Sequence, residues 1–153
     1  MKDEKLEGIL YYLLEKVNKV SRRYSQKVFD EQGWDITKDQ WLVLKKIADN
    51  HRISQVELAR ALFKDTAAIT RIINLMVDKK LVKREFRPDD KRQVELLLTN
   101  KGQKMFDVML PTVVEIRKKG VEGLSTIETE QLKSLLSRMI QNLEKTEGAD
   151  LHR

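Results

Sequence analysis

The sequence predicts a mainly α-helical protein that carries one small β-hairpin. Three observations lead to this fold class. Apolar residues recur at helical spacing through most of the 153 residues, only 2 prolines and 6 glycines are present to break helices, and strict apolar alternation is confined to residues 81–98. A chain of this length suits one compact domain with a core of its own.

Helix starts are marked by capping boxes, in which a Ser or Thr and a residue three positions later satisfy the free amides of the first turn. A first helix is expected from Leu6 to near Gly33, and Asp65 is a candidate cap for a later one. Thr99 predicts the start of a helix that is interrupted or bent near Pro111, and the tail from Gly148 to Arg153 is expected to fray. The three capping boxes are 37–40, 54–57 and 125–128.

Residues 81–98 follow the period of a strand. Val82 and Phe86 share one face of an extended run, and the apolar residues Val94, Leu96 and Leu98 occupy alternate positions of the next run. Between them, Pro-Asp-Asp-Lys at 88–91 has the composition of a tight turn. The order of short helix, turn, second helix and basic hairpin predicts a winged helix-turn-helix.

The net charge of +6 lies entirely in the middle third of the chain. Residues 52–104 hold 13 Lys and Arg against 7 Asp and Glu, and the remaining 17 basic and 17 acidic residues cancel. A cationic segment of this kind fits the phosphate backbone of double-stranded DNA. Ordinary solvated surface is the simpler alternative.

The second helix of the pair has an outward face of small, polar and basic residues. Its large apolar residues fall on the buried side: Ile69, Ile72, Ile73 and Met76. On the outward side, an arginine has the donors for guanine or phosphate, an asparagine can pair with adenine, and methyl groups can touch thymine. A generic solvated face is the alternative for each. This reading face consists of Thr66, Ala67, Thr70, Arg71 and Asn74.

Helix starts and the hairpin supply further candidates for DNA contacts. Free amides at helix starts favour phosphate, so Lys38, Ser54 and Gln55 are candidates for phosphate contacts, although plain capping explains Ser54 equally well.

The crowded cations of the hairpin repel one another unless a polyanion is near. An aspartate can hold an arginine extended toward the minor groove, with an exposed ion pair as the alternative. The hairpin candidates are Arg84, Arg87, Asp90, Lys91 and Arg92.

These motifs resemble the multiple-antibiotic-resistance regulator (MarR) family over about residues 6–145. Asp90-Lys91-Arg92 running to Leu98-Thr99, with Gly102 after it, is similar to the family's wing signature. Further matches are Thr70-Arg71 and Gln40-Trp41. The family often has glycine where this chain has Lys80, and left-handed backbone there costs another residue roughly 1 kcal/mol.

The resemblance implies a homodimeric transcriptional regulator, usually a repressor, on a palindromic operator. It also implies that Arg92 enters the minor groove and that Asp90 orients it. One domain over 1–153 is expected, with dimerisation helices at 6–32 and 100–146 and the DNA-binding lobe at 37–99. The long apolar stripes of the first and last helices favour a dimer independently, because each needs a partner surface. Packing within one monomer is the alternative.

Other sites have weaker support. Family members often bind small aromatic or carboxylate effectors. Four residues could contact such an effector, although a role as ordinary core residues explains them more simply: Tyr24, Trp41, Met105 and Met109.

His51 and His152 are the only histidines and cysteine is absent, so neither a metal nor a cofactor is expected. No catalytic motif of an enzyme is present. Without a signal peptide or membrane span, a cytoplasmic location is expected.

Two other functions are compatible with this fold. A winged-helix protein-interaction module without DNA binding is possible, because a fold does not fix a function. A protein that carries a small ligand, and for which DNA binding is incidental, is the other alternative. The positive charge of the middle third favours the DNA-binding regulator over both.

Overall fold

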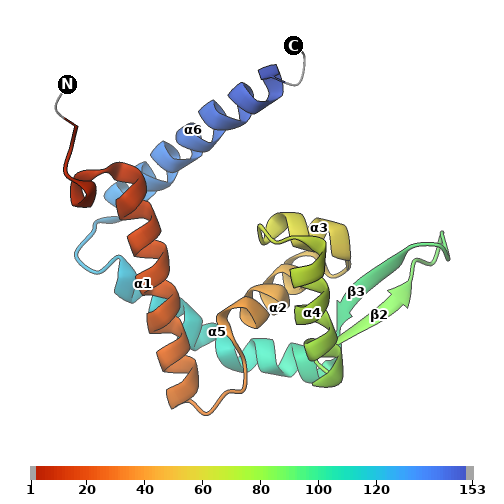
Figure 1. Cartoon of the computed structure of the whole chain (residues 1–153). Coiled ribbons are helices and arrows are strands. Elements are labelled where there is room, and N and C mark those ends of the chain that lie inside the picture. The colour runs from red at the N-terminus through yellow and green to blue at the C-terminus, as the bar shows by residue number, and fades with distance from the viewer. Residues whose placement is uncertain (1–2, 151–153) are drawn as a thin grey trace. The chain divides into compact units, whose positions relative to one another are not determined.

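The computed structural model describes residues 3–150, with side chains up to Gly148. The chain divides into two compact units, one up to Ile116 and one from Arg117 onward. The helix α5 (Asn100–Gly120) runs from the first unit into the second, and α6 (Thr126–Asp150) belongs to the second. The remaining elements, all in the first unit (Figure 1), are the 3-10 turn η1 (Leu6–Gly8), α1 (Leu10–Glu31), α2 (Lys38–Asn50), β1 (Ile53–Ser54), α3 (Gln55–Ala61), α4 (Thr66–Asp78), β2 (Val82–Phe86) and β3 (Val94–Leu98).

The three strands form one antiparallel sheet in the order β1-β3-β2. The predicted hairpin is confirmed: β2 pairs with β3 from Val82 opposite Leu98 to Phe86 opposite Val94. The short strand β1 pairs Ile53 with Leu96 and was not predicted, because two residues carry no periodicity. Since β1 leads directly into α3, it fixes the start of the helix pair to the base of the hairpin.

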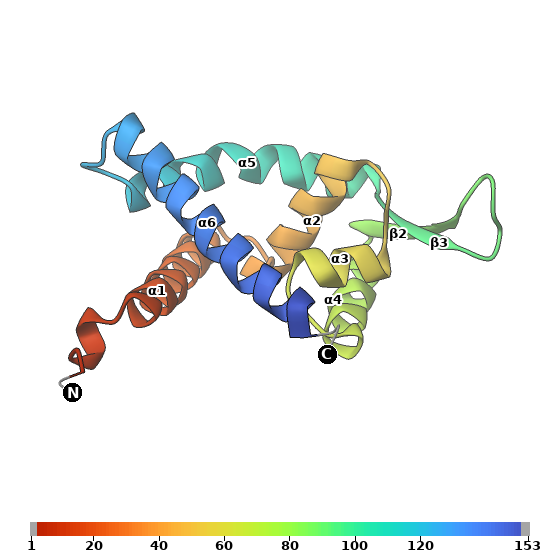
Figure 2. The ribbon, with the colours of Figure 1, turned by 90° about the horizontal axis from the view of Figure 1, so that it is seen from above.

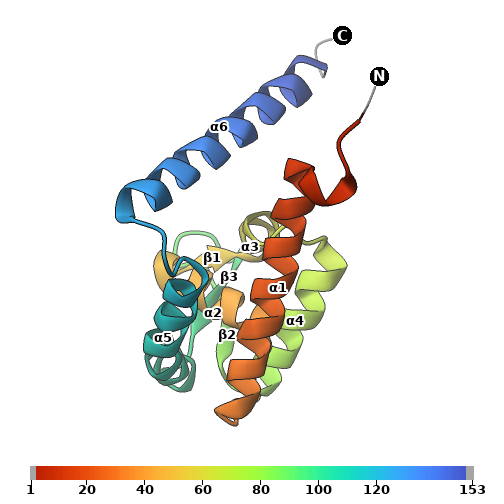
Figure 3. The same cartoon turned by 90° about the vertical axis from the view of Figure 1, so that its left-hand side faces the viewer.

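The core of the first unit lies around α2. In Figure 3, α2 stands between α5 on one side and α1 and α4 on the other. Trp41 of α2 is fully buried and stacks on Phe106 of α5, with ring centroids 5.3 Å apart and planes within 3°. The buried indole nitrogen of Trp41 has no hydrogen-bond partner among the described residues. Apolar contact alone therefore holds this ring pair in place.

Three helices of this unit end with a residue in the left-handed region: Gly33 (φ 72°), Phe63 (φ 55°) and Lys80 (φ 60°). At the end of α4, the amide of Lys80 donates to the carbonyl of Val77 and the amide of Leu81 donates to that of Met76, which is the Schellman arrangement. Lys80 therefore keeps the backbone geometry expected of a glycine. Left-handed backbone costs a residue with a Cβ about 1 kcal/mol.

Two expectations about helix ends were wrong, and the interruption that was one of the two outcomes expected near Pro111 is absent from α5. The first helix begins at Leu10, because residues 6–8 form a 3-10 turn ending in Gly8 and Ile9 is extended. The helix α5 is not interrupted at Pro111, since buried side chains on both sides of it, such as Met109 and Val113, anchor each half. The helix α6 continues to Asp150, past the expected fraying point. Residues 151–153 lie outside the described part.

An ionic cluster links α1, the start of α2 and the turn after α3. Asp39 of α2 accepts a hydrogen bond from Arg22 of α1, and its other carboxylate oxygen lies 3.1 Å from Nζ of Lys64. Burial raises the pKa of Asp39, but the hydrogen bonds from Arg22 and Lys64 outweigh burial and hold the pKa below its ordinary 3.8. The carboxylate therefore stabilises the folded chain at neutral pH.

We expect Asp39→Asn to lower the free energy of unfolding by about 1 kcal/mol near pH 7. The pKa of Asp39 is lower in the folded chain than its ordinary value of 3.8. The contribution of the wild-type carboxylate to stability is therefore complete at pH values above 3.8, and it disappears as the pH falls through the folded-state pKa. When the free energy of unfolding in urea is measured at a series of pH values, the values for the wild type and for Asp39→Asn should therefore converge in acid. The control is Asp49→Asn, which removes an exposed helical pair with Lys45 and should change little. A difference independent of pH would contradict the assignment.

Candidate nucleic-acid interface

The helices α3 and α4 form a helix-turn-helix whose two starts are both capped. The hydroxyl of Ser54 accepts from the amide of Glu57 at 3.2 Å, and the Glu57 carboxylate accepts from the amide of Ser54 at 3.0 Å. The hydrogen bond from the Ser54 backbone amide to the Glu57 carboxylate is the main cause that lowers the pKa of Glu57, and a hydrogen bond from the Ser54 side chain adds to the effect. Asp65 caps α4 by accepting from the amide of Ala68 at 2.7 Å. The predicted caps are confirmed, and the cap already occupies the Ser54 hydroxyl.

The helix α4 separates its apolar and polar residues as predicted. Ile69, Ile73 and Met76 are buried, and Ile72 is half-buried against the core. Of the reading face, Thr70 is half-buried and the other members are exposed, namely Thr66, Ala67, Arg71 and Asn74. The structure therefore brings the five residues of the reading face to one exposed side of one helix.

Two residues of the reading face are already hydrogen-bonded to neighbouring elements. Nε2 of Gln55 in α3 donates to the Thr70 hydroxyl at 2.5 Å. Nη2 of Arg84 in β2 donates to Oδ1 of Asn74 at 2.5 Å. Within residues 3–150, by contrast, the Arg71 guanidinium has no hydrogen-bond or ion-pair partner and is available to an external anion.

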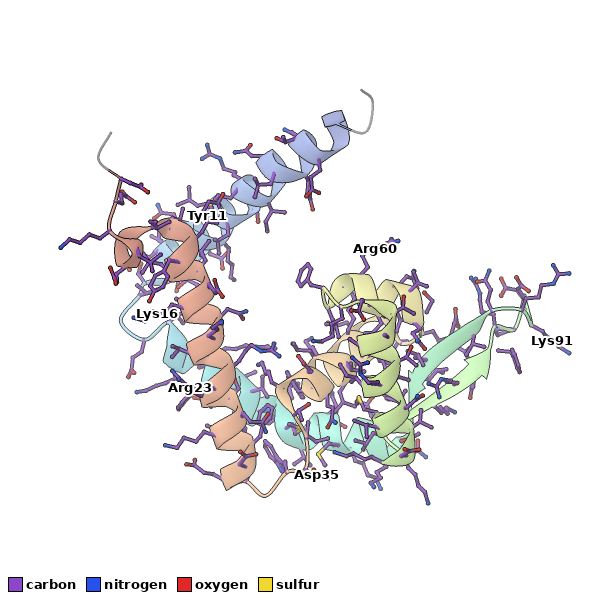
Figure 4. The ribbon with its side chains drawn as sticks, in the orientation of Figure 1. Tyr11, Lys16, Arg23, Asp35, Arg60 and Lys91 are labelled. Carbon is purple, nitrogen blue, oxygen red and sulfur yellow. The ribbon has the colours of Figure 1, made fainter. Side chains whose placement is uncertain are left out.

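The strands β2 and β3 project beyond α3 and α4 as an arm (Figure 2). This arm, residues 82–98, is the wing, and residues 87–93 form its tip loop. The loop is closed by the amide of Arg87, which donates to the carbonyl of Gln93 at 2.9 Å. Lys91 lies at the far end of the wing, whereas Arg60 projects from α3 (Figure 4). In the described part of the chain, the side chains of Lys91 and Arg92 form no ion pair.

Two wing residues, Arg87 and Asp90, form hydrogen bonds within the tip loop. Arg87 binds within the loop itself: its guanidinium donates to the Asp89 carboxylate at 3.1 Å and to Oε1 of Gln93 at 3.0 Å. The Asp90 carboxylate accepts from the backbone amide of Arg92 at 3.0 Å, so the contact between these two residues does not involve the guanidinium. Arg87 and Asp90 thus shape the loop that carries Lys91 and Arg92.

Sequence reasoning missed an ionic network at the base of the wing. Glu85 and Glu95 stand opposite each other on β2 and β3, and Arg52 binds both, at 3.1 and 3.4 Å. The hydrogen bond from Lys83 is the main reason that the pKa of Glu85 is lowered, and Arg52 adds to the effect. Once β1 is known, the register reveals the cluster, because Arg52 immediately precedes that strand. The network ties the base of the wing to the chain entering α3.

Comparison with known proteins identifies the family. The sequence profile of the MarR family matches residues 34–93. The transcriptional regulator HosA of Escherichia coli O111:H- is 32% identical over 106 residues, which cover 69% of this chain and 78% of HosA. The chain belongs to the MarR family. The resemblance inferred from the wing and the helix pair is thereby confirmed.

Other MarR-family proteins match over more of the chain. The HTH-type transcriptional repressor NicR of Pseudomonas putida is 29% identical over 142 residues, 90% of each protein. A crystal structure of a MarR mutant from E. coli complexed with operator DNA superimposes with a TM-score of 0.78 at 29% identity, covering 90% of this chain and 99% of that one. The mainly helical fold with a small β-hairpin wing is therefore the MarR fold.

Lys38, the remaining candidate for a MarR-type phosphate contact, lies at the start of α2. Its amide donates to Oε1 of Gln26 in α1 at 3.0 Å, while Thr37 and Gln40 complete the predicted capping box. The nearby Lys79, just after α4, donates to the carbonyl of Asp35 at 2.6 Å and to Oε1 of Gln40 at 3.2 Å. The start of α2 is thus fixed by α1 and by the end of α4, and the Lys38 amide is already used.

The four candidates for effector binding differ in their exposure in the single chain. Trp41 and Met109 are fully buried in the core, Met105 packs against that core, and Tyr24 is 42% exposed on α1. A groove along α1 is lined instead by Tyr12, Glu15, Lys16, Lys19, Val20 and Arg23. The structure therefore gives Trp41 and Met109 a packing role.

Metal ligands do not cluster in the described residues: no group of three or more His, Asp or Glu side chains is placed to share an ion. His51 sits after α2 at a positive φ of 62°, and His152 lies outside the described residues. No helix among the described residues is long and apolar enough to cross a membrane.

Proposed function

We propose that this chain is a transcriptional repressor that binds a palindromic operator in double-stranded DNA as a homodimer. Two features together support this proposal most strongly. The reading face of α4 is exposed, and the cations at the tip of the wing, Lys91 and Arg92, have no ion-pair partner in the described part of the chain. Exposed cations without acidic partners attract a polyanion, and a helix face free of acids can approach it closely. The names of NicR and HosA agree with a role in transcription.

Each part of the interface has a distinct task in this proposal. The reading face enters the major groove, where Arg71 has free donors for guanine or phosphate. The wing follows the backbone and brings Arg92 to the minor groove, where the potential is most negative. Ser54, Gln55 and Lys38 lie near the phosphates at helix starts, and Arg87 and Asp90 keep the tip loop in shape. Arg84 supports the reading face from β2.

Exposed apolar stripes support the homodimer. On α1, Leu10, Leu13, Val17 and Val20 are 51%, 43%, 67% and 44% exposed in the single chain. On α6, Leu132, Leu135, Ile140 and Leu143 are exposed as well, and no described side chain of this helix is buried. Water-exposed stripes of this length favour association. The proposal assigns residues 6–32 and 100–146 to the dimer interface and 37–99 to the DNA-binding lobe of one MarR-type domain.

The proposal extends to regulation and excludes catalysis. Since members of the MarR family bind small-molecule effectors, a small aromatic or carboxylate ligand is proposed to modulate DNA binding. An effector that binds the DNA-free form more tightly releases the operator by the same factor, because coupling between sites is reciprocal. The chain acts as a regulator and not as an enzyme, and it works in the cytoplasm, where bacterial DNA is found.

We expect Arg92→Ala to weaken binding to duplex DNA at least tenfold, because the wing then loses its contact in the minor groove. Fluorescence anisotropy with duplexes selected from a random pool measures the affinity, and the logarithm of the binding constant should fall steeply and linearly with the logarithm of the salt concentration. Dimerisation, followed by light scattering, should be unchanged.

Two results would contradict the proposed DNA-binding interface. An unchanged affinity of Arg92→Ala would remove the wing from the interface. A wild-type protein that ignores every duplex at low ionic strength would contradict the proposed function and favour a protein-interaction module. Lys5→Ala is the matched control and should bind as the wild type does, because it removes one positive charge from an exposed position outside both the lobe and the proposed dimer helices.

A further inference from the structure

We infer that Arg84 of the wing strand fixes the side-chain amide of Asn74, so that the reading face presents only hydrogen-bond donors to the base at that position. The inference rests on the DNA-binding function proposed above. It replaces the expectation that Asn74 pairs with adenine, and it makes Arg84 a residue that determines specificity through another residue.

The juxtaposition of Arg84 and Asn74 joins two elements of the interface. Arg84 lies on β2 and Asn74 on the exposed side of α4, and Nη2 of Arg84 donates to Oδ1 of Asn74 at 2.5 Å. A guanidinium has five N–H donors and no acceptor, so only the oxygen of the amide can face it. The reversed amide would set its NH₂ group against the arginine donors. The orientation of Asn74 is thus dictated by its partner.

This orientation decides which bases suit Asn74. An asparagine that recognises adenine uses both ends of its amide, since Oδ1 accepts from N6 and Nδ2 donates to N7. Here one of the two lone pairs of Oδ1 already accepts from the Arg84 guanidinium, and an adenine N6–H that reached the other would lie beside the positively charged arginine donors. Nδ2 has no hydrogen-bond partner among the described residues and can donate to a base. Its best partners are O6 or N7 of guanine and O4 of thymine, while adenine offers only N7.

The same arrangement occurs one turn earlier on the reading face. The Thr70 hydroxyl accepts from Gln55 and donates to the carbonyl of Thr66 at 2.7 Å. Its methyl group is then the part left for a base, and thymine carries the methyl that it can touch. Neighbouring elements therefore set the hydrogen-bonding character of both Thr70 and Asn74 before DNA arrives.

The test compares base preferences and not affinity alone. Wild-type protein selects duplexes from a random pool, and the recovered duplex is then varied to all four base pairs at each position. The position read by Asn74 is the one at which Asn74→Ala loses discrimination. There, we expect the wild type to bind guanine at least as tightly as adenine. Arg84→Met frees the amide, and the preference for adenine over guanine should rise by about tenfold, the value of one bidentate pair.

Lys83→Met is the matched control, because it removes one positive charge from the neighbouring position of the same exposed strand. It should leave the base preference as it was. The inference is overturned if Arg84→Met weakens binding to all four bases equally, as loss of a phosphate contact would. It is also overturned if wild type prefers adenine at this position, or if Asn74→Ala alters no preference. Failure of the wild type to bind any duplex overturns the proposed function as well, so the two failures are distinguishable.

Discussion

Gly102→Ala is expected to lower the free energy of unfolding by about 3 kcal/mol. A Cβ at Gly102 would lie 2.0 Å from the carbonyl oxygen of Leu81 and 2.9 Å from its carbonyl carbon. These backbone atoms cannot retreat easily. The amide of Leu81 closes the end of α4 by donating to Met76, and its carbonyl accepts from the amide of Thr99.

The measurement is thermal or urea unfolding at matched protein concentration, because dimer dissociation makes the midpoint depend on concentration. We expect the melting temperature to fall by about 10 °C. The control is Gly120→Ala, where an added Cβ meets nothing within 4 Å. It should be neutral or slightly stabilising, since alanine favours a helix. Equal melting temperatures for the Gly102 variant and the wild type would show that α5 can shift away from Leu81 at little cost.

Val17→Lys is expected to convert the proposed dimer into monomers and to weaken duplex binding by about a hundredfold or more. Val17 is 67% exposed in the single chain, so the substitution spares the core of the first unit. In the dimer it would bury a charge without a partner. A monomer also loses the gain of binding two half-sites at once, which is worth a factor of about 10² to 10⁴.

Sedimentation or light scattering reports the mass, and anisotropy with the selected duplex reports the affinity. Asn18→Lys is the matched control, because it introduces the same side chain at the next exposed position, away from the apolar stripe of α1. It should remain dimeric and bind DNA normally. If Val17→Lys stays dimeric with wild-type affinity, the stripe of α1 does not form the interface.

Local signals in the sequence predicted most of the fold. The capping boxes at Thr37, Ser54 and Ser125 are hydrogen-bonded as expected, because the cap and its partner are only three residues apart. The buried side of α4 followed from its period. Errors arose where tertiary contacts override local preference. Pro111 is an example, since packing on both sides keeps α5 continuous.

The sequence predicted that the reading face is exposed and that a wing follows it, but it did not predict the hydrogen bonds that some of their side chains form. The reading face and the wing are where the sequence placed them. Arg87 and Asp90 bind within the tip loop, however, and Asn74 is held by Arg84. These pairings depend on how a strand lies against a helix and on how a loop closes. Neither feature is encoded in the identity or spacing of the charged residues themselves. Composition alone therefore could not distinguish cations that are paired within the protein from cations that have no partner among the described residues.

The stacked position of Trp41 gives the protein an optical property of its own. The chain has only two tryptophans, Trp34 and Trp41, and only the second is wholly enclosed, with no hydrogen-bond partner for its indole N–H among the described residues. Emission from such a ring responds to the polarity around it. Any event that loosens α2 from α5, whether by denaturant, by an effector or by operator DNA, should therefore register as a spectral change without an attached dye.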